Sequence, residues 1–168
     1  GFITRLDLYM FEQSCLWLRR WADRGLEPVP ISVNFSRVNL TRNILPQFQE
    51  LQQRWNVPPE LLEFEFTETL VGADPQFFAG LTEEIHRCGF HCSIDDFGSG
   101  YSSLHMLQRV PADTLKLDKS LFDGLLDPGL RLRSELLIGS VLEMARRLGM
   151  TTVAEGISEA EQIRILEQ

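Results

Sequence analysis

Five short stretches of this chain are expected to be strands, and in the first two of them apolar and polar side chains alternate at a spacing of two residues. The expected strands lie at residues 29–36, 62–67, 90–95, 114–118 and 151–155. The stretches around and between them carry apolar residues at helical spacing. Strands that alternate with helices form parallel sheets through right-handed crossovers. The sequence therefore predicts an α/β fold, either an open doubly wound sheet or part of a TIM-like (β/α) barrel.

The length of the chain favours the partial barrel. A complete barrel takes about 250 residues, whereas this chain has 168. No G-x-G-x-x-G motif follows a strand, which weakens the doubly wound dinucleotide-binding alternative. The first residue is Gly1, and a helical pattern, expected to open with an S-x-x-E capping box at Ser158 and Glu161, still runs at Gln168. We expect a single domain over residues 1–168 that is cut at both ends, and that is inactive and aggregation-prone in isolation.

Charge and cysteine content narrow the classes of partner. The net charge of −8 disfavours general nucleic-acid binding, because an acidic surface repels phosphate backbones. A small phosphorylated ligand stays compatible if bound cations reverse the local field. Three cysteines without CxxC spacing indicate reduced thiols and a cytoplasmic location. No apolar run of about 18 residues is present, although a longer protein carrying this chain could be membrane-tethered.

Polar side chains gather at or just after the carboxyl end of every expected strand. They are Asn34, Glu65 with Glu68, Asp95 with Asp96, Lys116 with Asp118, and Glu155. In parallel α/β folds these ends form one face, where ligands bind. Clustered carboxylates repel one another unless cations neutralise them, and carboxylate and amide oxygens suit Mg²⁺ or Mn²⁺. Two such ions can clamp a phosphate and activate a water, and a lysine beside them could orient or deprotonate that water.

Several of these residues also have purely structural interpretations. One acidic residue at a strand end is most often solvated or a helix cap, so the hypothesis rests on five strands doing the same thing. Asp118 is the weakest member, because it could simply cap the segment that follows. Gly98 and Gly100 could cradle a phosphate or belong to a mobile loop. A further group, His86, Cys88, His91 and Cys92, fits no common zinc spacing.

Five segments in order and at matching spacing resemble the signatures of the EAL-domain family. They are Val33-Asn34-Phe35-Ser36, Glu65-Phe66-Thr67-Glu68, the run DDFGSGYSSL from Asp95 to Leu104, Leu115-Lys116-Leu117-Asp118 after Pro111, and Ala154-Glu155-Gly156. The DDFGSGYSSL run is highly specific. The resemblance covers essentially the whole chain and implies a TIM-like barrel that hydrolyses cyclic-di-GMP to linear pGpG with two Mg²⁺ or Mn²⁺ ions, in bacterial second-messenger signalling.

The resemblance also implies a role for each matched residue. Asn34, Glu65 and Asp95 would hold the first ion, and Asp95, Asp96 and Glu155 the second. Lys116 would contact the nucleophilic water, with Glu155 and Glu68 completing the catalytic group. Glu68 would brace the substrate loop Phe97, Gly98, Ser99, Gly100, Tyr101 and Ser102. In the family this loop couples metal binding to dimerisation, so a homodimer and a fused sensory or GGDEF domain are expected in the parent protein.

Three departures from the family pattern keep an alternative open. The Glu-Ala-Leu segment is expected upstream of Gly1, and the later Gln-Gly segment beyond Gln168. Ser158 stands where the family usually has a second glutamate. The alternative function is a catalytically inactive EAL domain that acts as a cyclic-di-GMP receptor or protein-interaction module. An enolase-like proton abstraction, which also uses a lysine base and metal-binding carboxylates, is opposed by the DDFGSGYSSL run.

Overall fold

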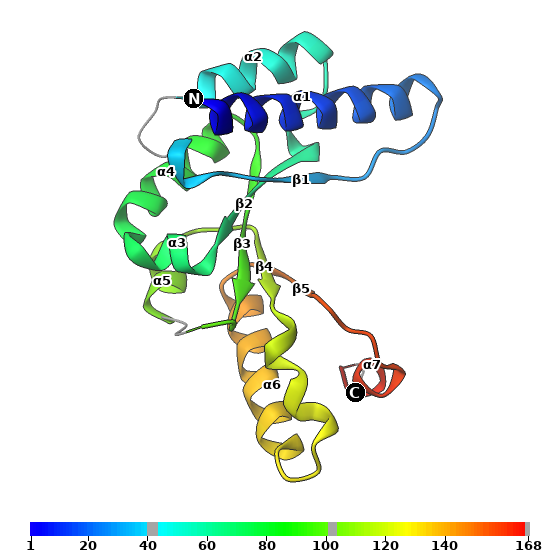
Figure 1. The fold of residues 1–168 in the computed structure, drawn as a ribbon, viewed down its shortest axis with the longest axis vertical. Helices are drawn as coiled ribbons and strands as arrows, with labels where there is room; N and C mark the ends of the chain where they lie inside the picture. Colours follow the sequence, from blue (N-terminus) through cyan, green and yellow to red (C-terminus); the bar gives the residue numbers. More distant parts are fainter. Residues whose placement is uncertain (40–43, 101–103, 167–168) are drawn as a thin grey trace.

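The computed structural model describes residues 1–39, 44–100 and 104–166 (Figure 1). The strands are β1 (Ile31–Asn34), β2 (Leu62–Thr67), β3 (His91–Phe97), β4 (Thr114–Leu117) and β5 (Thr151–Ala154). The helices are α1 (Phe2–Asp23), α2 (Leu45–Trp55), α3 (Glu68–Ala73), α4 (Pro75–Arg87), α5 (Leu104–Arg109), α6 (Arg131–Arg147) and α7 (Ala160–Leu166). Short 3-10 turns lie at Arg37–Asn39, Pro59–Leu61, Lys119–Leu121 and Asp123–Leu126.

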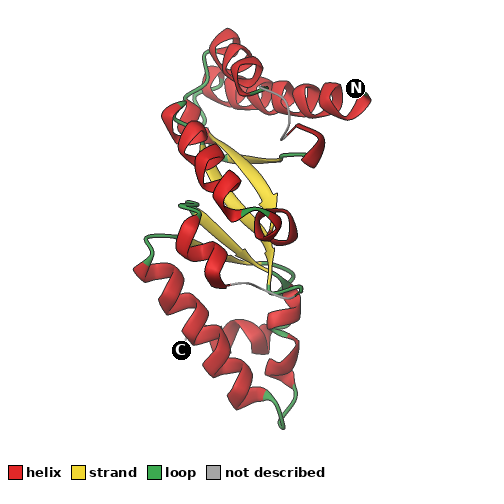
Figure 2. Cartoon of the chain, turned by 90° about the vertical axis from the view of Figure 1, so that its left-hand side faces the viewer, coloured by secondary structure: helices red, strands yellow, loops and turns green. Residues whose placement is uncertain are grey.

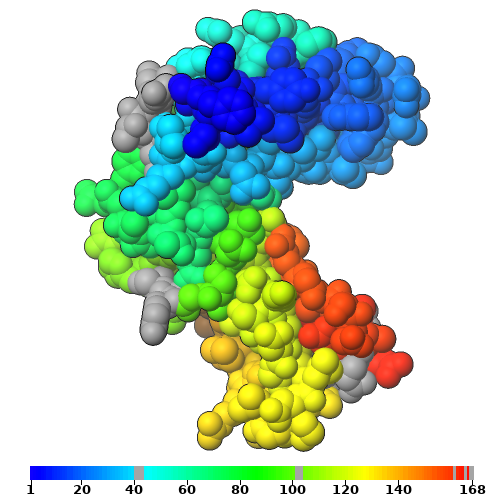
Figure 3. All heavy atoms as spheres, in the orientation of Figure 1, coloured from blue at the N-terminus to red at the C-terminus, as the bar shows by residue number. Residues whose placement is uncertain are grey.

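The five strands form one parallel sheet in the order β1-β2-β3-β4-β5. A doubly wound sheet changes direction at a switch point, whereas this order continues in one direction, as in the wall of a barrel. Figure 2 shows helices covering one side of the sheet, and Figure 3 shows a hollow between the N-terminal helices and the C-terminal segment. The predicted partial barrel of five strands is confirmed, and the doubly wound alternative is excluded.

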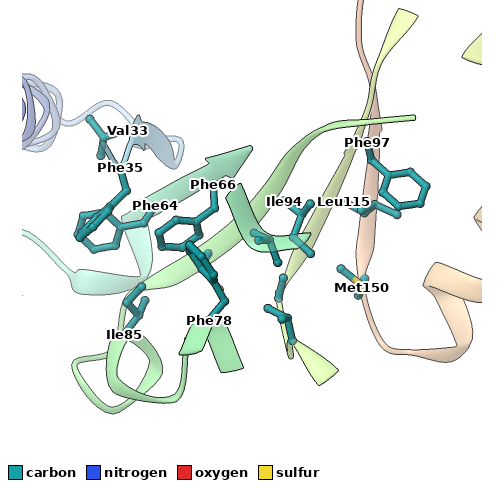
Figure 4. Packing of buried hydrophobic residues seen from close by; sticks show 14 of the residues in the cluster. Val33, Phe35, Phe64, Phe66, Phe78, Ile85, Ile94, Phe97, Leu115 and Met150 are labelled. Atoms are coloured by element: carbon teal, nitrogen blue, oxygen red, sulfur yellow. The ribbon is translucent and has the colours of Figure 1, made fainter. Parts of the chain in front are cut away.

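Each strand separates an apolar face from a polar one. In β2, Leu62, Phe64 and Phe66 are buried against the helices, while Glu63 and Glu65 alternate with them and lie on the opposite face. A cluster of phenylalanine rings fills the helix side (Figure 4), and Phe64 alone packs against Phe11, Phe35, Phe48 and Phe90. The core therefore lies between sheet and helices, which leaves the polar face for the site.

Glu63 lies on the polar face of the sheet, two residues before Glu65 on β2. Its carboxylate accepts hydrogen bonds from Ser32 on β1 (3.0 Å) and Thr114 on β4 (3.1 Å). Glu63 therefore links three strands one layer below Glu65, which is a structural role. Among the described residues, no helix is both long and apolar enough to cross a membrane.

Two helices show how local sequence relates to the fold. The buried stripe of α6 is Ile138, Val141 and Ala145, whereas Leu137 is about half exposed. The last helix begins at Ala160, two residues after Ser158. The backbone N–H of Glu159 donates to Gln162 Oε1 (3.2 Å), which is the side-chain contact of a capping box shifted by one residue.

Candidate metal and catalytic site

Side chains from four strands meet at the carboxyl end of the sheet. Lys116 Nζ lies 2.7 Å from Glu155 Oε1, 2.8 Å from Glu65 Oε1 and 3.3 Å from Asp95 Oδ1. Glu65 comes from β2, Asp95 from β3 and Lys116 from β4, and Glu155 directly follows β5. The structure therefore brings together four of the residues selected from the sequence, and the ammonium group is their common centre.

The environment of Lys116 fixes its charge. Burial alone would lower the pKa of this lysine, but hydrogen bonds to Glu155 and Glu65 and the charges of Glu65 and Asp95 raise it above its usual value. Glu65 and Asp95 keep less than 15% of their side chains exposed. Charges this well buried are tolerated only when they are paired, so the cation holds the carboxylates in one place.

A β-bulge explains how two consecutive aspartates reach the same end of the sheet. Ile94 pairs with Leu115 and Phe97 with Leu117, so β3 carries one extra residue between these pairs. Asp96 takes it up with a positive φ of 57°, a conformation that aspartate tolerates better than most residues. Asp95 Oδ1 accepts the backbone N–H of Asp96 (2.9 Å). Burial and the charges of Asp95, Asp118 and Glu155 raise the pKa of Asp96, which places it in the same negative field.

Asn34 stands beside the cluster at the edge of the sheet. It pairs with Glu65 in the register of β1 and β2, and both residues line a cleft of about 400 Å³. Ser36, Arg37, Thr67 and Thr69 complete the polar part of the lining. Arg37 was not selected from the sequence, because an isolated arginine in a loop carries no pattern; its guanidinium gives this cleft a positive group.

Glu68 does not join the lysine cluster. It is buried at the first position of α3, and its Oε2 accepts the backbone N–H of Gly98 at 2.9 Å. Its Oε1 is buried and has no hydrogen-bond partner among the described residues. Glu68 therefore fixes the start of the glycine-containing loop, as the resemblance implies. The sequence did not reveal α3, since six residues are too few for a helical period.

The loop residues divide into three groups. Phe97 differs from its expected substrate-loop role, because it is the last residue of β3 and is buried in the core. Gly98, Ser99 and Gly100 follow the strand, and Ser120 Oγ donates to the carbonyl of Gly98 (3.2 Å). Tyr101 and Ser102 lie outside the described residues. The strand was expected to end at residue 95, which placed Phe97 in the loop, whereas the bulge lets β3 continue to Phe97.

Asp118 and Ser158 lie near the site but outside the cluster around Lys116. Asp118 Oδ1 accepts the N–H of Ser120 (2.9 Å), and this hydrogen bond lowers the pKa of Asp118. The interpretation of Asp118 as a cap is therefore confirmed. Ser158 is exposed on the segment that follows Glu155.

The donor set fits hard divalent cations. Glu65, Asp95, Asp96 and Glu155 contribute carboxylate oxygens and Asn34 contributes an amide oxygen, the ligand types that Mg²⁺, Mn²⁺ and Ca²⁺ prefer. Three of these carboxylates contact one ammonium group and Asp96 adds a fourth negative charge nearby, which leaves an excess of negative charge. Lys116 stands in for part of the positive charge that the carboxylates require.

Comparison with known proteins identifies the family. The EAL domain profile matches residues 1–168, and the chain belongs to this family. The cyclic di-GMP phosphodiesterase NbdA of Pseudomonas aeruginosa is 31% identical over 169 residues, which are 100% of this chain and 21% of NbdA. The bifunctional diguanylate cyclase/cyclic di-GMP phosphodiesterase MucR of the same organism is 29% identical over 164 residues, 96% of this chain and 24% of MucR.

Solved structures agree with the fold. The MucR phosphodiesterase in complex with c-di-GMP superimposes with a TM-score of 0.87 at 28% identity, over 99% of this chain and 67% of that one. The manganese/cy-diGMP complex of BlrP1 from Klebsiella pneumoniae gives a TM-score of 0.80 at 25% identity, over 98% of this chain and 41% of that one. The chain spans about a fifth of the length of the curated relatives that it matches.

Proposed function

We propose that this chain carries the catalytic centre of a metal-dependent phosphodiesterase that hydrolyses cyclic-di-GMP to linear pGpG in bacterial second-messenger signalling. The observation that supports this most directly is the meeting of Glu65, Asp95 and Glu155 around Lys116 in an EAL-domain fold. The names of NbdA and MucR and the c-di-GMP bound to the MucR phosphodiesterase support the substrate.

Asn34, Glu65, Asp95, Asp96 and Glu155 would hold two divalent ions, Mg²⁺ or Mn²⁺. When bound, such ions lower the pKa of water and offset the charge of the reacting phosphate. The manganese complex of BlrP1 supports a divalent metal requirement, and the oxygen-only donor set supports hard ions.

Lys116 would position the attacking water and offset negative charge at the phosphate. Its Nζ has three carboxylate partners that hold it at the carboxyl end of the sheet. The raised pKa of Lys116 favours an ammonium group that donates hydrogen bonds over a neutral amine that accepts a proton. Bound ions would lower the pKa of Lys116. Lys116 would therefore deprotonate the water only in the protein that holds the ions. Glu68 would keep Gly98 and the loop after it in place.

The arrangement of the parent protein is part of the proposal. We infer a longer EAL domain with further barrel elements, a fused sensory or GGDEF domain, a homodimer through the loop after β3, and a cytoplasmic site of action. The bifunctional description of MucR supports a fused cyclase. Three free cysteines in the described residues support a reducing compartment.

The test measures pGpG formation by a protein that carries the complete domain, with Mg²⁺ or Mn²⁺ and with a chelator. Turnover that requires the ion and is lost in Glu65→Gln supports the proposal. Tight c-di-GMP binding without any pGpG would make the protein a receptor instead. This outcome is tested because Ser158 stands in place of the usual glutamate. Absence of binding as well as turnover would contradict both.

A further inference from the structure

A second group of metal-binding side chains lies at the opposite end of the sheet from Lys116. His86 Nε2, near the end of α4, is 2.8 Å from Asp113 Oδ2, which directly precedes β4. Cys92 Sγ, near the start of β3, is 3.8 Å from the same His86 nitrogen. Ligand atoms of these three residues all lie within 4.8 Å of one another. The strands begin here, so this group, which we call the basal cluster, is separate from the carboxylates at their carboxyl ends.

We propose that the basal cluster is a binding site for a zinc-type transition-metal ion, with His86, Cys92 and Asp113 as ligands. Bond lengths of about 2.0–2.3 Å around a tetrahedral ion place neighbouring ligand atoms roughly 3.3–3.6 Å apart. The measured separations of 2.8 and 3.8 Å lie on either side of this range. His86 and Asp113 are each about one-third exposed, so they can move the few tenths of an ångström that binding requires, and a water can complete the tetrahedron.

The surroundings of Asp113 resemble those of a supported metal ligand. Its Oδ2 accepts the backbone N–H of Cys92 at 2.8 Å, and His91 Nδ1 lies 3.4 Å from its Oδ1. Although burial would raise the pKa of Asp113, these donors and His86 lower it, so the carboxylate stays charged. Ligating carboxylates are commonly held by such outer hydrogen bonds, and His91 would have this positioning role.

The chemistry of binding exchanges protons for the ion. Burial raises the pKa of the Cys92 thiol to about 12, so Cys92 is neutral until an ion binds and its proton then passes to solvent. The ion would also replace the hydrogen that His86 and Asp113 share. The mixed nitrogen, sulfur and oxygen donors favour Zn²⁺ over Mg²⁺, because thiolate is a soft ligand.

The spacing of these residues along the sequence disfavours a metal site, but the fold brings their side chains together. Gly89 separates His86 from Cys92 along the chain, but its positive φ of 82° turns the chain back so that the two side chains meet. Asp113 comes from a different strand connection, which spacing along the chain cannot reveal. Cys88, which the sequence grouped with them, is not part of the cluster among the described residues.

The experiment titrates Co²⁺, a spectroscopic substitute for Zn²⁺, into protein that carries the whole chain and has first been saturated with Mg²⁺. We expect one equivalent to produce a thiolate-to-cobalt charge-transfer absorption, which the oxygen-only site cannot give, and Zn²⁺ to abolish it by displacement. Cys92→Ser should remove the absorption, whereas Cys88→Ser and Asp95→Ala should keep it. His91→Ala should weaken binding about 10- to 100-fold.

His86→Ala keeps the test decisive if the buried Cys92 substitution prevents folding, because His86 is partly exposed. Its Co²⁺ affinity should fall at least tenfold while its circular dichroism spectrum is unchanged. A wild-type protein without the charge-transfer absorption, or an absorption that survives in folded Cys92→Ser or is undiminished in His86→Ala, would overturn the proposal. Because no readout depends on c-di-GMP, the result is independent of the proposed phosphodiesterase activity.

Discussion

At the scale of single residues, Lys116 links the geometry to the proposed chemistry. In the complete domain, we expect Lys116→Ala to lower kcat by about 100-fold or more, the loss typical of a missing proton-transfer or positioning group. The affinity for c-di-GMP should stay within about tenfold, because the cleft beside Asn34 is unchanged. Single-turnover pGpG formation and equilibrium binding measure the two quantities separately.

Asp95→Ala provides the contrast to this change. It removes a carboxylate that contacts Lys116 and would help to hold the divalent ions, so we expect turnover and divalent-ion binding to be lost together. If Lys116→Ala kept a near-normal kcat, Lys116 would be only an ion-pair partner of the buried carboxylates.

Asp96 should destabilise the protein when no divalent ion is bound. A carboxyl group whose pKa is raised by folding stabilises the fold below its unfolded pKa, and this stability is lost as the pH rises through the folded pKa. The raised pKa of Asp96 therefore implies that its charge is unfavourable at neutral pH. Asp96→Asn should therefore raise the Tm slightly in a chelator at pH 7. The gain in the free energy of unfolding should be no more than about 0.5 kcal/mol, as is usual for exposed positions.

The low-pH limit is the control for Asp96→Asn. Near pH 3 wild-type Asp96 is protonated, so the two proteins should have equal Tm. Asparagine also accepts the positive φ at this position, so backbone strain does not confuse the comparison. With saturating Mn²⁺ the order should reverse, because an amide is the weaker ligand. A lower Tm for Asp96→Asn in the chelator at pH 7 would contradict the unfavourable charge.

At the scale of elements, the turn after β3 depends on one glycine. Gly98 has φ +96°, and a Cβ added there would lie 2.5–2.8 Å from the side chain of Leu121. We expect Gly98→Ala to lower the free energy of unfolding by about 1–3 kcal/mol, from left-handed strain and overpacking together. Urea denaturation measures this loss.

Gly100→Ala is the matched control, since a Cβ at Gly100 meets nothing within 4 Å. It should change stability by less than about 0.5 kcal/mol. Equal losses for the two variants would mean that general loop flexibility, and not the packing of Gly98 on Leu121, sets the cost.

Local patterns predict some elements well and miss others for identifiable reasons. β2 has the expected bounds because Leu62, Phe64 and Phe66 are buried on one face, and the alternation is uninterrupted. β3 runs to Phe97, since a bulge is invisible to a two-residue period. The start of α6 is hard to recognise from the sequence because its first turns are exposed: Leu132 is 69% exposed. Short elements such as α3 carry too few residues for any period.

The residues of the candidate site could also be predicted only in part. Glu65, Asp95, Lys116 and Glu155 could be predicted, because a parallel sheet brings its strand ends together whatever the helices do. The hydrogen-bond partner of Glu68 could not be predicted, since the bond to Gly98 depends on the path of a loop. The basal cluster was missed because Asp113 arrives from the connection to another strand.

At the scale of the whole molecule, exposed leucines on α6 should promote self-association. Leu132, Leu136 and Leu137 are each more than half exposed, and contiguous apolar surface of this kind favours contact between molecules. We expect the 168-residue chain to form larger species as its concentration rises, and Leu132→Lys with Leu136→Lys to reduce them without lowering the Tm. Light scattering coupled to size exclusion measures the mass.

Ile138→Lys is the control on the same helix. Ile138 is buried, so a lysine there should unfold the chain and increase aggregation. If the two leucine substitutions left the mass distribution unchanged, the association would arise elsewhere, for example at the edge strands β1 and β5.

The order of strands in the sheet has a consequence for how the chain acquires its structure. Every strand pairs with the one made just before it, so that Ser93 pairs with Thr114 and Thr114 with Thr151. Contacts between strands thus join positions about 20 to 40 residues apart, so in the part of the chain that the structure describes no strand pairs with a segment from the far end of the chain. During synthesis from the N-terminus, each new strand and helix can add to a sheet that is already present. Lys116 would reach Glu65 and Asp95 before Glu155 has been made, so the ion-pair cluster assembles in the order of translation.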